Sequence, residues 1–164
     1  MRRARGKALE PEQAADPRAA RAAAVTLLAR RDFASGELAA KLASQGYDAQ
    51  NVAALVQELT DKRMLNDARY AENFVSYHAA RGQGPQRIRQ LLKAQSLAEA
   101  LIDAVLEGGP DWRALARTVR QRKFGATAPK EWSEKSKQAR FLQYRGFSTD
   151  HIRAALGRDF DPEP

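Results

Sequence analysis

The chain carries one motif three times: LASQGYDAQNVAALV at residues 42–56, LKAQSLAEALIDAVL at 92–106 and LQYRGFSTDHIRAAL at 142–156. The copies align without a gap at a spacing of fifty residues, and their apolar positions coincide. Helical sequences sometimes align by chance, because a 3.6-residue period tolerates many offsets. A small residue also recurs at positions 46, 96 and 146, which makes chance a poor explanation. Each copy therefore predicts a helix, a turn and a second helix.

The turns of the motif carry residues that end and start helices. Gly46 and Gly146 stand just past a predicted helix, where a left-handed backbone conformation is common. Asp48 and Ser148 follow where an N-cap residue would begin the next helix. In the middle copy Ser96 replaces the glycine, and we expect it to form a capping box with the glutamate three residues on.

A further helix is predicted before each motif, over about 20–31, 67–81 and 111–123. The fold class is therefore all-α, with three tandem three-helix repeats of about fifty residues. Such small units bury a face against their neighbours, so we expect an elongated, curved array. The expected boundaries are a disordered basic tail at 1–18, repeats at 19–66, 67–109 and 110–158, and a loose C-terminus at 159–164.

Composition argues against catalysis and against a metal site. The 164 residues include no cysteine, and the two histidines, His78 and His151, are far apart in sequence. No nucleophile–base pattern or phosphate-binding glycine loop is present, so we expect no cofactor and no enzymatic activity. No apolar run reaches the roughly 18–20 residues that cross a bilayer. The N-terminus lacks the apolar core of a signal peptide, which predicts a cytoplasmic protein.

The basic excess lies in two blocks. Lys and Arg number 28 against 20 Asp and Glu, a net charge of +8, and the excess falls within 62–93 and 112–145. This distribution favours a polyanionic partner, in the cytoplasm most often nucleic acid. Arg89 and Lys93 would also be i, i+4 neighbours on a helix and repel each other, a hint that an anion lies between them.

Four stretches resemble the RecX family of bacterial RecA regulators: LLARRDFASGEL at 27–38, NDARYA at 66–71, GPQRI at 84–88 and RFLQYRGFS at 140–148. The resemblance runs from about residue 22 to 156, and the tandem three-helix units of that family agree with the repeat. One departure is Ser96, where the family more often has glycine. The N-terminal tail lies outside the resemblance.

The resemblance implies a non-enzymatic protein that binds RecA, chiefly its filament on single-stranded DNA, and lies in the helical groove. Such binding suppresses ATP hydrolysis, strand exchange and the co-protease activity that triggers the SOS response. The implied roles are DNA repair and homologous recombination. Contact with single-stranded DNA, and with double-stranded DNA as a weaker expectation, is implied too. We expect a monomer.

Basic side chains in the matching segments are the candidates for contact with RecA or DNA: Arg30, Arg31, Lys41, Arg69, Arg81, Arg87, Arg89, Lys93, Arg117, Arg120, Arg140 and Arg145. For Arg69 and Arg87 the alternative is a structural role. The aromatic residues Tyr47, Tyr70, Phe74 and Phe147 are expected in the core rather than as base-stacking platforms. Two other functions stay open: a single-stranded DNA-binding protein that acts without RecA, and a helical adaptor whose charge serves solubility alone.

Overall fold

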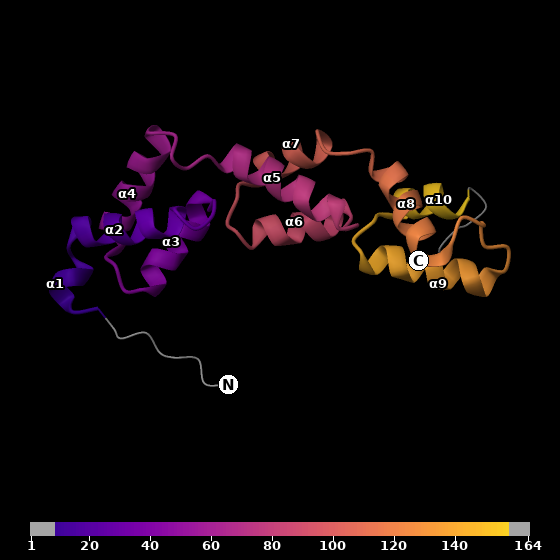
Figure 1. Ribbon diagram of the computed structural model, residues 1–164, viewed down its shortest axis with the longest axis horizontal. Coiled ribbons are helices and arrows are strands. Elements are labelled where there is room, and N and C mark those ends of the chain that lie inside the picture. Colours follow the sequence, from indigo (N-terminus) through magenta and orange to yellow (C-terminus); the bar gives the residue numbers. More distant parts are fainter. Residues whose placement is uncertain (1–8, 158–164) are drawn as a thin grey trace. The chain divides into compact units, whose positions relative to one another are not determined.

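The computed structural model describes residues 9–157, which form ten α-helices and no strand (Figure 1). The expected C-terminal segment 159–164 lies outside the described residues. The helices are α1 (Pro11–Ala14), α2 (Pro17–Leu28), α3 (Ser35–Ser44), α4 (Ala49–Asp61), α5 (Asp67–Ala80), α6 (Pro85–Lys93), α7 (Glu99–Glu107), α8 (Trp112–Phe124), α9 (Trp132–Tyr144) and α10 (Thr149–Leu156). The prediction of an all-α fold with three tandem three-helix units is confirmed.

Contacts divide the chain into two compact units. Among the described residues, the first holds 9–70 together with Gln95–Leu97, and the second holds Ala71–Ala94 and 98–157. We call α2–α4 the first module, α5–α7 the second and α8–α10 the third. The third module and most of the second therefore belong to one compact unit.

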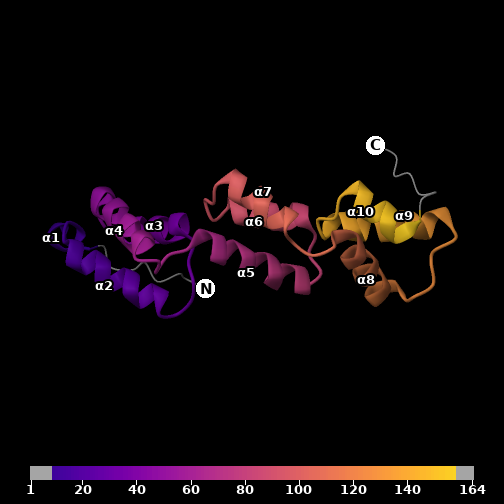
Figure 2. The ribbon, with the colours of Figure 1, turned by 90° about the horizontal axis from the view of Figure 1, so that it is seen from above.

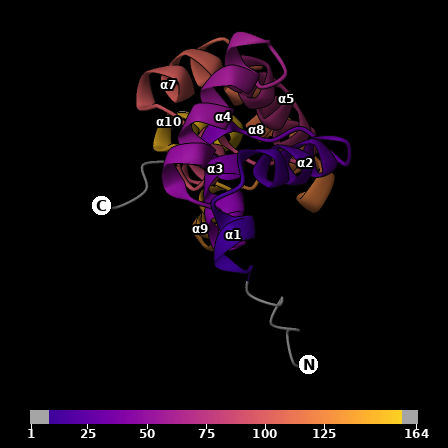
Figure 3. The ribbon, with the colours of Figure 1, turned by 90° about the vertical axis from the view of Figure 1, so that its left-hand side faces the viewer.

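In the first module α2, α3 and α4 pack against one another (Figure 3). Leu38 and Leu42, four residues apart on α3, are fully buried together with Leu59 of α4. The N-cap role predicted for Asp48 is confirmed, because its carboxylate accepts hydrogen bonds from the backbone N–H groups of Gln50 and Asn51. The module thus follows from its apolar spacing and its cap.

The expected disordered tail at 1–18 is wrong for residues 9–18, while residues 1–8 lie outside the described part of the chain. Helix α1 occupies Pro11–Ala14, and α2 begins at Pro17. The carbonyl oxygen of Ala14 accepts a hydrogen bond from the backbone N–H of Asp48 at 3.0 Å. The prolines that suggested disorder are first-turn residues of helices, where the ring fixes a helical φ and no N–H is lost.

In the second unit α8, α9 and α10 pack closely as the third module, and α6 packs on α7 (Figure 2). Phe147 is buried in the core of the third module, as predicted. Ser148 N-caps α10, also as predicted, in a capping box with His151, whose Nδ1 accepts from the Ser148 N–H at 3.2 Å. The His151 side chain is half-buried.

The small residue of each motif takes a left-handed conformation: φ is +100° at Gly46, +60° at Ser96 and +92° at Gly146. The capping box predicted for Ser96 is therefore wrong. Ala98 is the N-cap of α7, and it makes no side-chain cap. Ser96 instead performs the backbone role of the two glycines, despite the cost that a Cβ adds there.

The second and third modules meet where two glycine turns cross. The Gly84 N–H donates to the Arg145 carbonyl at 2.8 Å, and the Gln86 N–H donates to the Gly146 carbonyl at 3.0 Å. A Cβ on Gly84 would lie 2.4 Å from the carbonyl carbon and oxygen of Gly146. Because these are backbone atoms, only glycine fits, and the crossing fixes how turn 81–84 lies against turn 144–146.

A similar close approach occurs inside the first unit. A Cβ on Gly36 would lie 2.6 Å from the Cβ of Ser96 and 3.2 Å from the Gln95 carbonyl oxygen. The Asp67 carboxylate accepts from the N–H and the hydroxyl of Ser35, at 2.7 and 2.5 Å. These contacts attach the start of α3 to residues of the next module.

Candidate partner-binding surface

Several of the predicted binding cations are already paired with carboxylates. Arg89 of α6 pairs with Asp103 of α7 at 2.5 Å, and Lys93 pairs with Glu99. Our interpretation that Arg89 and Lys93 repel each other unless an anion lies between them is wrong, because each has an acidic partner on the adjacent helix. Arg89 and Lys93 are both predicted binding residues, and part of their positive charge is balanced by carboxylates of the same module.

The cations near the start of α3 are paired as well. Arg31 forms an ion pair with Glu37 at 2.5 Å and stacks over Phe33, with its guanidinium carbon 3.6 Å from the ring centre. Arg69 lies 3.6 Å from the Asp32 carboxylate. Arg69 lies in the first turn of α5 and Asp32 lies between α2 and α3, so the pair links these two segments. This link supports a structural role for Arg69.

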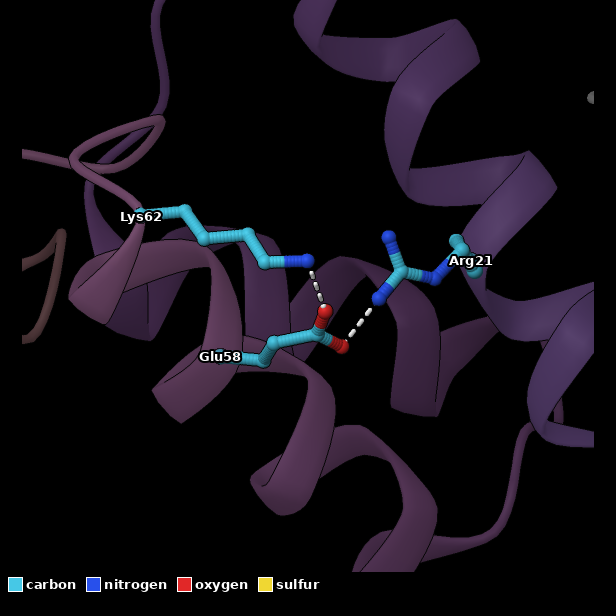
Figure 4. A network of polar contacts seen from close by, with 3 residues as sticks. All are labelled: Arg21, Glu58 and Lys62. Atoms are coloured by element: carbon cyan, nitrogen blue, oxygen red, sulfur yellow. Dashed lines mark hydrogen bonds and ion pairs between the residues drawn. The ribbon is translucent and has the colours of Figure 1, made fainter.

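A shared carboxylate joins α2 to α4 in the same unit (Figure 4). Glu58 accepts hydrogen bonds from the guanidinium of Arg21 and, at 2.6 Å, from the ammonium of Lys62. Hydrogen bonds from Lys62 and Arg21 hold the pKa of Glu58 below its usual range. Three basic side chains of the first module, Arg21, Arg31 and Lys62, therefore balance carboxylates within it.

Arg120 is not available to a partner, so its place among the binding candidates is a correction. The residue is only 3% exposed. Its guanidinium donates to the carbonyl oxygens of Gly125, Ala126 and Thr127 at 3.0–3.1 Å, and it lies 3.4 Å from the Gln138 side-chain oxygen. Arg120 fastens the loop between α8 and α9. The signal was present in the sequence, because Ala116, Val119 and Arg120 share one face at i, i+3, i+4 spacing.

Arg87 and Arg145 lie at the glycine crossing. Arg87 donates to the Tyr144 carbonyl at 3.5 Å and stacks over its ring, with 5.6 Å between guanidinium carbon and ring centre. Arg145 donates to the Arg81 carbonyl at 3.3 Å and lies over the ring of Phe141. Both side chains tie the second module to the third, and Arg87 stays largely exposed.

The other candidates are exposed and form no ion pair with a carboxylate in residues 9–157: Arg30, Lys41, Arg81, Arg117 and Arg140. Arg30 and Lys41 belong to the first unit and the other three to the second. Within the second unit Arg81 and Arg145 share a hollow with Arg122 and Lys123. Arg122 and Lys123 belong to the second basic block, 112–145, but are not among the predicted binding residues.

The aromatic residues lie largely as expected. Tyr47 packs against the core of the first module and Phe147 is buried, whereas Tyr70 and Phe74 are half-buried. Tyr144 was not singled out from the sequence and is 76% exposed. In the described part of the chain, no three His, Cys, Asp or Glu side chains cluster as metal ligands do. Over the same residues, every helix is too short or too polar to span a membrane.

Known proteins resemble this chain in sequence over most of its length. Family models described as the first, second and third three-helix domains of RecX match residues 20–59, 66–106 and 111–156. "Regulatory protein RecX" of Halorhodospira halophila is 46% identical over 145 residues, covering 88% of this chain and 90% of that one. Its counterpart in Vibrio campbellii is 44% identical over 135 residues, covering 82% and 87%.

Solved structures share the fold. The crystal structure of RecX from Lactobacillus salivarius superposes with a TM-score of 0.75 at 20% identity, over 85% of this chain and 94% of that chain. A second structure, described as regulatory protein RecX, gives a TM-score of 0.72 at 20% identity, over 92% of this chain and 79% of that chain. At such identity the likeness concerns the fold alone.

Proposed function

The chain belongs to the RecX family of regulatory proteins, and we propose that it inhibits the RecA recombinase without catalysing a reaction of its own. The proposed target is the RecA filament on single-stranded DNA, with the protein lying in the helical groove. Binding there would suppress ATP hydrolysis, strand exchange and co-protease activity. The observation that carries the proposal is the ordered match of three RecX domains, together with 46% identity to a RecX regulatory protein.

The exposed cations support contact with a negatively charged partner. Arg81, Arg117 and Arg140 have no carboxylate partner among residues 9–157. Charges of this kind speed association and orient a complex more than they set its affinity. In this proposal the protein acts as a monomer in the cytoplasm, with DNA repair and the SOS response as its context.

The test is RecA ATP hydrolysis on single-stranded DNA, with this protein added at a small fraction of the RecA concentration. Because one bound molecule would affect several RecA subunits of a filament, we expect inhibition well below one molecule per RecA. Inhibition that begins only when the DNA itself is saturated would contradict the proposal.

The second candidate function is binding to single-stranded DNA independently of RecA. The hollow lined by Arg81, Arg122, Lys123 and Arg145 favours it, because four cations converge there. Inhibition of RecA would then follow DNA occupancy and would fall steeply as salt is raised. An order-of-addition experiment separates the two: a pre-formed RecA filament covers the DNA and should resist a protein that only competes for it.

A further inference from the structure

Four cations from three segments line one hollow of about 260 Å³ in the second unit. Arg81 follows α5, Arg122 and Lys123 lie in the last turn of α8, and Arg145 follows α9. Val119 and Phe141 add an apolar wall. We call this the basic hollow.

No carboxylate balances the basic hollow. Its lining contains no acidic residue, and none of its four cations takes part in an ion pair within residues 9–157. Cations in the last turn of a helix are favoured by the helix dipole, which accounts for Arg122 and Lys123. Arg81 directly follows α5 and Arg145 is the C-cap of α9, so the C-terminal ends of three helices border the hollow and favour its positive charge.

Two of the four cations are held in place by neighbouring groups. The guanidinium carbon of Arg81 lies 4.4 Å from the ring centre of Tyr77, and that of Arg145 lies 5.3 Å from the ring centre of Phe141. The crossing of Gly84 and Gly146 fixes the backbone of the same turns. The hollow thus presents charge on a rigid support, which lowers the entropy lost when an anion binds.

A second hollow borders the same turn, 144–146, and its chemistry differs. Its lining residues are Gln86, Arg87, Arg89, Gln90, Gln143, Tyr144 and Gly146, of which Arg89 is also paired with Asp103 of α7. Arg87 lies over the Tyr144 ring, and the tyrosine side chain is otherwise largely open to solvent. We call this the amide hollow. Exposed aromatic rings beside amides and guanidinium groups suit nucleobases, which stack on rings and exchange hydrogen bonds through their edges.

We propose that the two hollows bind one short segment of single-stranded nucleic acid, with a backbone phosphate in the basic hollow and a neighbouring base on Tyr144. An acidic protein would explain the four cations but not the exposed ring among glutamines. The inference rests on the proposed function only in that the RecA filament contains nucleic acid. It adds where on this protein that nucleic acid would bind.

Direct binding to a fluorescein-labelled twenty-nucleotide oligothymidylate, followed by anisotropy, tests the phosphate site. The variant Arg122→Ala with Lys123→Ala removes two exposed cations and leaves the hydrogen bonds of the glycine crossing intact. We expect about a tenfold loss of affinity in low salt. The slope of log affinity against log salt should fall by about 0.7 for each phosphate that the variant no longer neutralises.

The matched control is Arg113→Ala with Lys130→Ala. It removes the same net charge from two exposed positions that lie outside both hollows and form no ion pair within residues 9–157. We expect less than a twofold change in affinity. An equal loss in the two double variants would overturn the proposal, since net charge alone would then govern binding, and no loss in either would overturn it as well.

Tyr144 provides a readout that charge does not affect. Tyr144→Ala should weaken oligothymidylate binding by about fivefold or more, because base stacking on an aromatic ring contributes on the order of that factor. Tyr144→Phe keeps the ring and should bind like the parent. If the Phe variant is as weak as the Ala variant, the stacking part of the proposal is wrong.

Two further measurements separate this inference from its neighbours. Poly-glutamate that displaces the oligonucleotide as well as unlabelled oligothymidylate does would identify an acidic protein as the ligand and overturn the proposal. RecA ATP hydrolysis is measured in parallel on the same variants. A parent protein that fails to inhibit RecA but shows the expected anisotropy pattern would refute the proposed function and leave the nucleic-acid site standing.

Discussion

Replacing Gly84 by alanine should break the junction between the second and third modules. Gly84 has φ −84° and ψ 167°, which any residue adopts, so alanine introduces no backbone strain. Its Cβ would lie 2.4 Å from the carbonyl carbon and oxygen of Gly146 and 2.5 Å from the N of Phe147. An ordinary contact begins near 3.4 Å, so the two turns must separate by about 1 Å.

The energetic cost follows from what that separation breaks. The hydrogen bonds from Gly84 to Arg145 and from Gln86 to Gly146 contribute about 1 kcal/mol each. Crowding of well-packed groups costs about 1–3 kcal/mol. Alanine offsets roughly 0.4–1 kcal/mol by restricting the unfolded chain. We expect a net loss of about 2–4 kcal/mol in the free energy of unfolding, or about 5–15 °C in Tm for a chain of this size.

Thermal and urea unfolding followed by far-ultraviolet circular dichroism measures the loss. The control is Gly108→Ala, because Gly108 has φ −76° and a Cβ there would meet only the Ala104 carbonyl oxygen at 3.4 Å. The control should be as stable as the parent or slightly more stable. If Gly84→Ala melts within about 2 °C of the parent, or if Gly108→Ala loses as much, the crossing does not join the modules as described.

Three other substitutions test local features. Arg120→Ala should lower the free energy of unfolding by about 2–4 kcal/mol, because the loop carbonyls lose their charged donor. Trypsin should also cleave the variant faster after Lys130. The control Arg117→Ala, in the same helix as Arg120, should change neither the stability nor the rate of cleavage. Ser96→Gly should raise stability by about 1 kcal/mol in urea unfolding, because it relieves a φ of +60°. Burial lowers the pKa of His151, and Arg113 lowers it further against the opposing carboxylates of Asp150 and Asp111. The folded state then favours the neutral imidazole, so the parent should lose stability as pH falls below about 6.5, and His151→Gln should show a flatter profile between pH 7.5 and 5.5.

The repeat was predictable because it rests on a backbone requirement. Positions 46, 96 and 146 all need a positive φ, and a small residue in register marks them. Local pattern matching went wrong at Ser96, since a serine before a glutamate also fits a capping box. The register of the repeat was the stronger evidence, because a turn that closes three equivalent units tolerates fewer conformations than one helix start does.

The binding surface was less predictable, because the positions of cations in a sequence do not say which of them are already paired. The partners of Arg89 and Lys93 lie on the next helix, and Arg120 is buried by a loop whose path the sequence does not give. Helical spacing would have flagged Arg120, which continues the apolar face of Ala116 and Val119. Tyr144 is absent from the predicted binding residues because no sequence rule distinguishes an exposed aromatic residue from a buried one at a helix end.

The two basic blocks consequently have different roles. Arg89 and Lys93 of α6 pair with Asp103 and Glu99 of α7, so part of the first block is neutralised by the helix that follows it. The second block, 112–145, has ten basic side chains against two acidic ones, Glu131 and Glu134. Its one ion pair within residues 9–157 joins Lys137 to Glu134 in α9, and Arg120 holds the loop. Most of the remaining positive charge therefore has no carboxylate partner in that part of the chain, and an external anion is the natural source of balance. The third module and its border with the second are thus where substitutions should separate binding from folding.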